Sequence, residues 1–464
     1  MSATQLYILP SSFRDPAGYV FIEDKTVKRA VTFKGKANYD LLMSSGLYDR
    51  LVDNDWMVRH QEESRDFDPV SGIYKTILPE QLDYISYPYE WSFSQLQDAA
   101  LLTLQIQMLA MKHGMSLKDA SSFNVQFRGP HPVFIDTLSF QENKRGPWIA
   151  YDQFCRHFLA PLLLMSNLSP NFNQFLKASL DGFPLDLTST LLPLRTYLQF
   201  GPLIHLHLHA RTQKKYASAP KRPNGWAIAS PARDPKPAII ESLVSTIESQ
   251  KLRRKQGNWI NYYRDAHHYS PIDEEFKKSV VSSTLKQTRP ACVYDLGGNT
   301  GNYSRLATAQ GIRCVCYDFD PLCVNENYLQ SKARNDLRML PLLMDLNNPS
   351  PGLGFDSCER LSFIERPKPD LVFALAILHH LRITGNVPLR RISQFFAKLT
   401  RWLLIEFIPK QDEMAMRLLQ GREDVFDDYS LPDFYRIFGR YFRLQQVWET
   451  PDNRRLLCLF ENRT

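Results

Sequence analysis

Two acids and a group of glycines form the first candidate site for chemistry. Residues 293–302 read V-Y-D-L-G-G-N-T-G-N, in which Asp295 ends an apolar stretch and a glycine turn follows. Gly297, Gly298 and Gly301 allow a tight bend and a close approach of backbone N–H groups to a ligand. Such a turn is typical of sites that bind a nucleotide-like cofactor.

A second acid follows at the spacing that a ribose-binding residue needs. The helix-compatible run from Tyr303 to Gln310 comes after the turn, and a second apolar strand, Arg313 to Tyr317, ends at Asp318. An acid at the tip of this strand can accept hydrogen bonds from the hydroxyls of a ribose. The sequence therefore predicts a strand–turn–helix–strand unit that holds a ribose-containing cofactor.

The turn resembles motif I of class I S-adenosylmethionine (SAM) methyltransferases, which usually reads D-x-G-x-G-x-G. Here it reads D-L-G-G-N-T-G, with Asn299 in place of the middle glycine. The resemblance covers residues 257–464. The segment Y-D-F-D-P resembles the second motif, in which Asp318 would bind the ribose and Asp320 would cap the next helix.

Later segments resemble the remaining landmarks of that family in order. Leu343-Met344-Asp345 resembles the segment beside the adenine, whose exocyclic amine would donate to Asp345. Pro369 to Leu381 resembles the fourth strand with its loop, Trp402 to Phe407 the fifth strand, and Phe438 to Glu461 the closing antiparallel hairpin. The resemblance implies a Rossmann-like α/β domain with a seven-stranded sheet and SAM bound at the strand tips. The implied cofactor-binding residues are Asp295, Gly297, Gly298, Asn299, Gly301, Asp318 and Asp345.

Two adjacent histidines, His379 and His380, follow the predicted fourth strand. Either could act as a general base, since imidazole titrates near neutrality. The alternative is a scaffold role around the cofactor, which H-H-L often has in this family. The loop contains neither an Asn/Asp-Pro-Pro-aromatic sequence nor a cysteine. This disfavours methylation of an adenine amine or a pyrimidine ring, and the acceptor is not identified.

A second candidate site lies within the first 210 residues. Asp119 and Asn124 have the spacing D-x-x-x-x-N, and an apolar strand then leads to Asp136. This pattern resembles the catalytic and metal-binding loops of protein-kinase-like phosphotransferases. There the first Asp orients the acceptor hydroxyl, while the Asn and the second Asp hold magnesium. The resemblance implies an α+β, kinase-like domain that would bind ATP and Mg²⁺.

This segment also departs from the kinase pattern. L-K-D replaces the H-R-D triplet, Thr137 follows the metal-binding Asp, and no glycine-rich phosphate loop is present. The alternative is that these polar residues serve turns and caps, and that the domain recognises the methyl acceptor instead. The candidate phosphate-pairing cations are Lys28, Arg29 and Lys75.

The elements around this second site can also be predicted. Tyr84 to Trp91 would form a strand and hinge, Ser94 to Lys112 an amphipathic helix, and Trp148 to Met165 a helix of a second lobe. Arg211 to Pro237 is rich in proline and basic residues, which predicts a stiff connector. A helix, Ala238 to Lys255, would follow it. The predicted domains are residues 1–210, a linker and helix at 211–256, and 257–464.

Three histidines alternate with leucine in L-I-H-L-H-L-H-A, at His205, His207 and His209. In a strand they would share one face and could approach a metal. No acid or cysteine accompanies them, and in a helix they would not converge. We therefore favour a half-buried polar face and expect no metal. The aromatic residues Trp259 and Tyr263 precede the methyltransferase-like region and would cover the cofactor.

The composition is that of a globular protein with two or three domains. The chain has 464 residues, 44% hydrophobic and 23% charged, and its formal charge of +7 does not by itself indicate nucleic-acid binding. Seven cysteines without a C-x-x-C pair favour a reducing compartment. The start lacks a signal-peptide pattern and the apolar runs are too short for a membrane span, so we expect a cytoplasmic protein.

Three functions remain open on these grounds. The first is a SAM-dependent methyltransferase of a small molecule or glycan, whose N-terminal domain aids acceptor recognition. The second is a bifunctional kinase–methyltransferase that uses Mg-ATP. The third is an RNA methyltransferase or a non-catalytic SAM-binding scaffold; nucleic acid is not favoured as a partner. The oligomeric state is not predicted.

Overall fold

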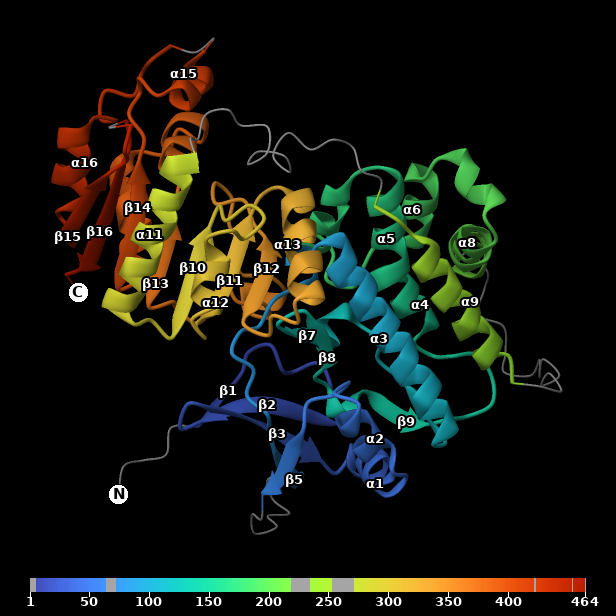
Figure 1. The fold of residues 1–464 in the computed structure, drawn as a ribbon. Coiled ribbons are helices and arrows are strands. Elements are labelled where there is room, and N and C mark those ends of the chain that lie inside the picture. The colour runs from blue at the N-terminus through green and yellow to red at the C-terminus, as the bar shows by residue number, and fades with distance from the viewer. Residues whose placement is uncertain are drawn as a thin grey trace. The chain divides into compact units, whose positions relative to one another are not determined.

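The computed structural model describes residues 6–63, 72–217, 234–252, 271–420, 423–452 and 454–463. The chain folds as two compact units (Figure 1). Unit 1 comprises Met1–Arg253 and Gly352–Arg360, and unit 2 comprises Arg254–Pro351 and Leu361–Thr464. Each unit contains its own principal β-sheet.

Unit 1 begins with a five-stranded antiparallel sheet in the order β1-β2-β3-β5-β4. The β2–β3 hairpin turns at Asp24 and Lys25, whose positive φ angles of 47° and 67° suit a two-residue hairpin turn. The strands are Leu6–Ile8 (β1), Gly18–Glu23 (β2), Thr26–Thr32 (β3), His60–Glu63 (β4) and Ile73–Pro79 (β5).

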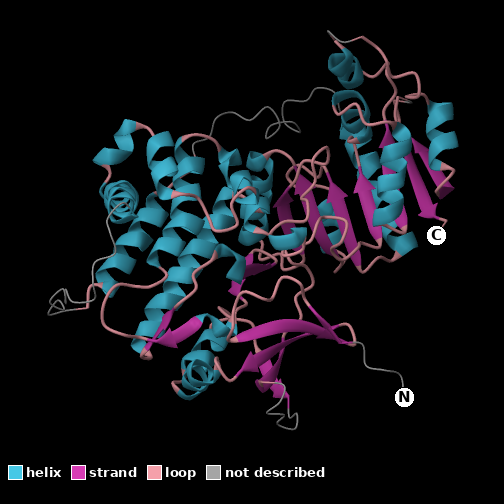
Figure 2. Cartoon of the chain, turned by 180° about the vertical axis from the view of Figure 1, so that it is seen from behind, coloured by secondary structure: helices cyan, strands magenta, loops and turns pink. Residues whose placement is uncertain are grey.

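Helices form most of the rest of unit 1 (Figure 2). The longest, α3, begins with a capping box: Ser92 Oγ accepts from the backbone N–H of Gln95, and the Gln95 side chain accepts from the N–H of Ser92. The α-helices are Lys36–Ser44 (α1), Leu47–Asp53 (α2), Phe93–Lys112 (α3), Tyr151–Phe154 (α4), Ala160–Asn167 (α5), Leu185–Leu191 (α6), Phe200–Pro202 (α7), His209–Ala217 (α8) and Lys236–Ser249 (α9).

Two short antiparallel strand pairs follow α3. β6 (Met115–Leu117) pairs with β9 (Phe140–Glu142), and β7 (Val125–Arg128) pairs with β8 (His131–Phe134). A five-stranded sheet, a long helix and two small strand pairs follow one another in this unit, which confirms the predicted α+β class. The predicted strand within residues 84–91 is wrong, because β5 already ends at Pro79 and residues 88–90 form a 3-10 helix.

The histidine-rich segment is helical and not a strand. Leu203–Leu208 is a π-helical segment that continues into α8. His205 lies between the hydroxyls of Tyr151 and Ser242, each 2.8 Å from one ring nitrogen. His207 is held in the same way by two hydroxyls, at 2.7 and 2.8 Å. Because hydroxyl groups occupy both nitrogens of each ring, these side chains build a polar packing layer.

Two further helices predicted for unit 1 are present, but with different limits. The helix predicted at 238–255 is α9, but it ends at Ser249, and residues 253–270 lie outside the described part of the chain. Trp259 and Tyr263 therefore also lie outside it. The helix predicted at 148–165 is present as α4 and α5, joined by the π-helical turn Cys155–Leu159.

Unit 2 contains a seven-stranded sheet in the order β12-β11-β10-β13-β14-β16-β15. The first five strands in this order are parallel, and β16 runs antiparallel to both β14 and β15. The closing antiparallel hairpin was predicted and is confirmed. The strands are Cys292–Leu296 (β10), Arg313–Asp318 (β11), Met339–Leu343 (β12), Leu371–Ala374 (β13), Trp402–Phe407 (β14), Phe442–Glu449 (β15) and Leu456–Asn462 (β16).

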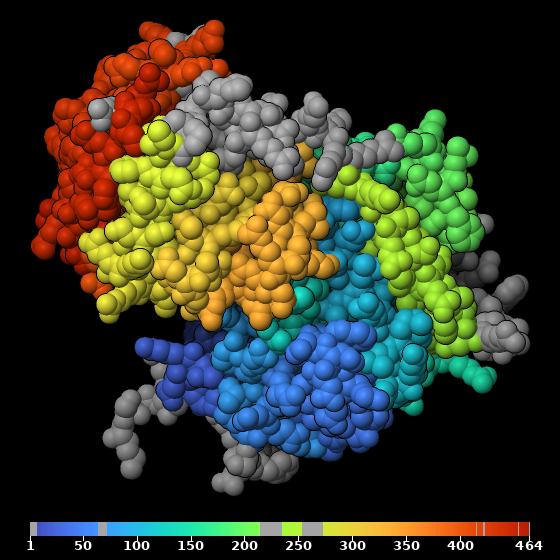
Figure 3. Space-filling view, viewed as in Figure 1, coloured from blue at the N-terminus to red at the C-terminus, as the bar shows by residue number. Residues whose placement is uncertain are grey.

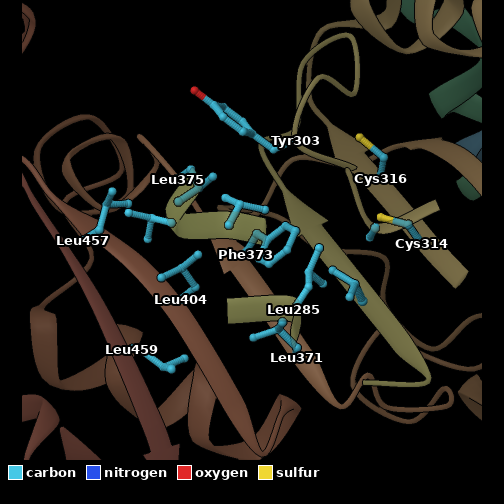
Figure 4. Close-up of a cluster of buried hydrophobic side chains, with 14 of the residues drawn as sticks. Leu285, Tyr303, Cys314, Cys316, Leu371, Phe373, Leu375, Leu404, Leu457 and Leu459 are labelled. Carbon is cyan, nitrogen blue, oxygen red and sulfur yellow. The ribbon is translucent and has the colours of Figure 1, made fainter. Parts of the chain in front are cut away.

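Helices and strands of unit 2 meet in one apolar cluster. Leu371, Phe373 and Leu404 of the central strands are fully buried in it, together with Leu285 of the first helix (Figure 4). Burial on both faces explains why these strands read as continuous apolar runs. The helices are Pro271–Thr288 (α11), Ser304–Thr308 (α12), Pro321–Ala333 (α13), Leu389–Leu399 (α14), Glu413–Leu419 (α15) and Leu431–Phe438 (α16).

No disulfide bond joins any of the seven cysteines, all of which lie in the described part of the chain. Burial raises the pKa of the Cys314 and Cys316 thiols well above the ordinary value, so both behave as core residues. Within the described ranges, no helix is both long and apolar enough to cross a membrane.

Candidate functional site

The glycine turn of unit 2 follows β10 directly and is tied to the neighbouring strand. The backbone N–H groups of Gly297 and Gly298 both donate to the carbonyl of Tyr317 in β11, at 2.8 and 3.0 Å. A Cβ on Gly298 would lie 2.4 Å from the Cys316 sulfur, so only glycine fits there. Gly297 has a φ of 81°, which glycine adopts without strain. The two glycines let the turn bend sharply against β11.

Asn299, the departure from the usual motif, has a structural explanation. Its φ is 52°, in the left-handed region that Asn tolerates better than most residues. Its side-chain oxygen accepts from the N–H of Thr300 at 2.7 Å. Its own N–H donates to Asp318 Oδ2 at 2.8 Å. Asn299 therefore supports the turn in place of the missing glycine.

The two predicted acids lie at the tips of adjacent strands and are buried. Asp318 also accepts from the N–H of Asp320, at 2.9 Å, while Asp295 accepts from the Ser304 hydroxyl at 2.6 Å. Burial raises the pKa of Asp295 to about 6 and that of Asp318 to about 6. As predicted, Asp320 caps the next helix by accepting from the N–H of Leu322. Two neighbouring carboxyls with raised pKa values are a feature of functional sites.

A cavity of about 320 Å³ runs over this turn. Its wall includes Asp345 together with His379 and His380. Gly301 does not line it; a Cβ there would collide with the side chains of Arg305 and Asn327, and its φ is 82°. The other lining residues include Asp295, Gly297, Gly298, Asn299, Tyr303, Asp318, Phe319, Met344 and Ile377. The cavity thus gathers six of the seven predicted cofactor-binding residues with both histidines.

A buried group of four charges forms another part of this region. Lys277 of α11 lies 2.6 Å from Glu406 at the end of β14, and Arg455 approaches the same carboxylate at 3.7 Å. Arg455 also pairs with Asp412 at 2.8 Å. Lys277 and Arg455 line the cavity, whereas the two acids do not. The two positive charges of this group therefore face the cavity, while the two acids that neutralise them lie behind.

Glu406 also accepts a hydrogen bond from the loop that carries the histidines. Its second oxygen accepts from the N–H of Ala376 at 2.9 Å, and Ala376 has a φ of 53°. Our sequence analysis did not single out Lys277, Glu406 or Arg455. An acid at the tip of a buried strand was the available signal for Glu406. Lys277 carried no comparable signal, because nothing local shows which turn of a helix faces a ligand.

His379 and His380 lie side by side but differ in the charges around them. Their rings lie 4.2 Å apart, and burial lowers the pKa of both. The pKa of His379 falls well below its ordinary value, first through burial and then through the charges of His380, Arg455 and Lys277. Among the described residues, its Nδ1 has no hydrogen-bond partner. His379 is thus a neutral, buried imidazole on the cavity wall.

The candidate residues of unit 1 also come together. The Asp119 carboxylate accepts from the side chains of Asn124 and Gln153, and burial followed by the charge of Asp136 raises its pKa. Asp136 pairs with Arg29 of β3 at 2.7 Å. Both acids also accept from backbone N–H groups two residues ahead, as turn formers do. The other two candidate cations, Lys28 and Lys75, pair with glutamates of the sheet.

Unit 2 has the fold of class I SAM-dependent methyltransferases, with the glycine turn and the strand-tip acid in place. No protein-family profile matches the chain. The chain is 33% identical over 457 residues to the nodulation protein NoeA of Rhizobium meliloti (strain 1021), covering 97% of this chain and 95% of that protein. The chain belongs to the NoeA family.

Two solved structures with similar folds each cover less than half of the chain. The N-methyltransferase NodS from Bradyrhizobium japonicum WM9, with bound S-adenosyl-L-homocysteine (SAH), is 14% identical with a TM-score of 0.33 and covers 45% of this chain and 94% of its own. WbdD, described as a bifunctional kinase-methyltransferase, is 16% identical with a TM-score of 0.32 and covers 45% of this chain and 42% of its own. Because these TM-scores are low, the methyltransferase fold of unit 2 is assigned from its strand order.

Proposed function

We propose that the protein is a SAM-dependent methyltransferase acting on a small molecule or glycan. The observation that carries this proposal is the cavity over the glycine turn, where Asp318 at the tip of β11 accepts a hydrogen bond from the turn itself. Its relative NoeA is named a nodulation protein, and we propose that this chain also takes part in nodulation.

The residues of the cavity suit the parts of SAM. Asp318 would accept from the ribose hydroxyls, Asp345 from the adenine amine, and Asp295 with the glycine turn would lie at the methionine end. SAM also carries a carboxylate. Lys277 and Arg455 are the cations on the cavity wall, and we assign the methionine carboxylate to them. SAM, when bound, supplies an activated methyl group.

His379 is our candidate for the proton acceptor. A hydroxyl or amine of the acceptor attacks the methyl carbon, the carbon–sulfur bond breaks, and the acceptor loses one proton. His379 is neutral because burial and two nearby cations lower its pKa, so one ring nitrogen can accept the proton. The same cations disfavour the imidazolium, so His379 would pass the proton on and not keep it. Nδ1, which has no partner among the described residues, is the atom available for this step.

Methyl transfer is tested with tritiated SAM and an extract of the source cells. The purified protein should label a product, and His379→Ala should lower the rate of labelling while SAH binding persists. A non-catalytic scaffold would bind SAH and label nothing. An RNA acceptor would leave the label in nuclease-sensitive material, with binding that falls steeply as salt rises. Labelling that is equal with and without the protein would refute the proposal.

A second candidate activity is phosphotransfer by unit 1. Its support is the kinase-like strand order together with the grouping of Asp119, Asn124 and Asp136. Among the described residues, no group of three or more His, Cys, Asp or Glu side chains could hold a metal. A kinase-like loop holds Mg²⁺ with one Asp and one Asn, so this absence does not weigh against phosphotransfer. The recognition role is favoured instead by the ion pair at 2.7 Å between Asp136, the expected metal ligand, and Arg29.

Thermal shift with ATP separates the two roles of unit 1. A kinase predicts a shift with ATP that requires Mg²⁺ and disappears in Asp136→Asn. Asp49→Asn, a change on the exposed face of α2, serves as the control. The absence of any shift in the native protein would exclude the bifunctional alternative and leave unit 1 as the recognition domain.

A further inference from the structure

Unit 1 has a cavity of about 630 Å³ that neither of the proposed activities uses. The end of α5, the short helix α7 and one face of α9 line it, and Figure 3 shows α9, in yellow-green, at the surface. Its volume lies within the range of about 300–1,000 Å³ that is usual for ligand sites. The lining residues are Ser166, Asn167, Gln199, Phe200, Gly201, Pro202, Ser242, Ser245, Thr246, Ser249, Gln250 and Lys251.

The residues that line this cavity are mostly polar and almost uncharged, although about half of the lining surface is apolar. Eight of the twelve residues named above carry a hydroxyl or an amide, one is a lysine, and none is an acid. Ligand pockets are usually mainly apolar, with a small number of polar groups. Eight side chains with hydroxyl or amide groups favour a ligand that carries hydrogen-bonding groups over a wholly apolar one, and the lining has no carboxylate to pair with a cation.

The hydroxyls of α9 are oriented by their own hydrogen bonds. Thr246 Oγ1 donates to the carbonyl of Ser242 at 2.7 Å, and Ser249 Oγ donates to the carbonyl of Thr246 at 2.8 Å. A hydroxyl has one hydrogen to donate but two lone pairs. Since the hydrogen of each is already used, both oxygens can only accept. Ser249 Oγ already accepts from the Gln250 amide at 3.2 Å, so one lone pair remains there for an O–H or N–H group of a ligand.

The floor of the cavity is fixed in the same way. Gln250 is 7% exposed; its side-chain oxygen accepts from the Ser166 hydroxyl at 3.0 Å, and its amide donates to the carbonyl of Thr246 at 3.0 Å. Gln97 holds the backbone carbonyl of Gln250 at 3.0 Å. A Cβ on Gly201 would lie 2.0 Å from Thr246 Oγ1, so glycine allows α7 to approach α9. The site is therefore built before any ligand arrives.

One large apolar side chain stands at this polar site. Phe200 is 72% exposed although its ring is fully apolar. A sugar ring presents hydroxyls around its edge and C–H groups on its faces, so it can use both the oxygen-rich wall and an exposed aromatic ring. We propose that this cavity binds an uncharged, polyhydroxylated ligand, namely a neutral oligosaccharide.

The test is an array of neutral and uronic-acid oligosaccharides, followed by calorimetry on any neutral glycan that is retained. Ser245→Trp should fill the cavity and Phe200→Ala should remove the ring, and each should weaken binding by about tenfold or more. Two matched controls should bind as the native protein does. They are Glu248→Trp, exposed on the same helix, and Phe175→Ala, a 57% exposed phenylalanine elsewhere in unit 1.

Three results would overturn the inference. The array could retain no neutral glycan, or all four variants could bind a retained glycan equally well. The array could also retain only uronic-acid glycans, with binding that weakens as salt rises, which would mean that the charge of Lys251 binds the ligand. The thermal transition of each variant shows that it is folded. The inference does not depend on methyl transfer, because SAH binding by unit 2, measured in parallel, reports on that proposal separately.

Discussion

The backbone N–H of Asn299 donates to Asp318 Oδ2 at 2.8 Å, which joins the glycine turn to the acid at the tip of the next strand. This bond leaves Asp318 Oδ1 to accept from Asp320 and holds the carboxylate in one orientation. The residue that departs from the usual methyltransferase motif thus fixes the residue that we expect to bind the ribose.

Substitutions at Asn299 test whether its left-handed backbone conformation matters. Asn299→Gly should keep SAH affinity within about threefold, because glycine adopts a positive φ without strain and keeps the N–H donor. Asn299→Val should weaken SAH binding by about tenfold, since a left-handed conformation costs a non-glycine residue about 1–2 kcal/mol and more for a β-branched one. Calorimetry on both variants checks this; stronger binding by the valine variant would contradict it.

The buried pair of Lys277 and Glu406 predicts an asymmetric effect on stability. Lys277→Met should lower the free energy of unfolding by about 3–5 kcal/mol, because it leaves a buried carboxylate without its nearest cation. The double variant Lys277→Met/Glu406→Gln should recover most of that loss. Urea unfolding measures both. A single variant as stable as the native protein, or a double variant no better than the single, would show that the pair is not coupled.

The same double variant tests the assignment of the methionine carboxylate. SAH carries this carboxylate, whereas 5′-methylthioadenosine lacks the whole amino acid. The variant should lose about tenfold in affinity for SAH and less than about threefold for methylthioadenosine, because a charge-assisted hydrogen bond contributes about 1.5–3 kcal/mol. Lys286→Met, exposed on the same helix, is the control. Equal losses for both ligands would place the carboxylate elsewhere.

Binding of SAH should weaken in acid. Burial raises the pKa of Asp318 to about 6, so the free protein is protonated there below pH 6 and carries the carboxylate above it. The ribose hydroxyls donate to the carboxylate, so binding favours the charged form and lowers the pKa. Affinity should be constant near pH 7.5 and fall by up to about tenfold per unit below pH 6. Asp295, with a similar pKa, adds to the effect.

Calorimetry of SAH binding from pH 5 to 8 measures this dependence. Asp318→Asn should flatten the curve, because the amide does not titrate, although Asp295 preserves part of the slope. An affinity that rises on acidification would mean that the protonated acids bind the ligand, contrary to our assignment.

Much of unit 2 could be predicted because its signals are local. The apolar run of β14 gave the limits 402–407, and the glycine turn with Asp318 placed the cofactor side of the cavity. The charged group beside the cavity could not be predicted. Lys277, Glu406 and Arg455 come from a helix, a strand and a hairpin far apart in the sequence, and only the fold brings them together.

Unit 1 shows where local patterns fail. Alternating leucine and histidine at residues 204–209 has the period of a strand, yet the segment forms a π-helical turn whose histidines bond to hydroxyls from other elements. Those partners are distant in sequence, so the pattern alone could not favour a helix. Residues 84–91 are rich in aromatic, strand-favouring residues. Pro88 instead begins a 3-10 helix, and the capping box of α3 follows directly, so no strand forms there.

Calorimetric titration of SAH into the native protein and Asp318→Ala tests the central claim most directly. Asp427→Asn, an exposed acid of unit 2, is the matched control. We predict that the native protein and the control bind SAH alike, and that Asp318→Ala binds at least about tenfold more weakly, since it loses charge-assisted hydrogen bonds to the ribose. A native protein that does not bind SAH, or an alanine variant that binds it equally well, would contradict the account.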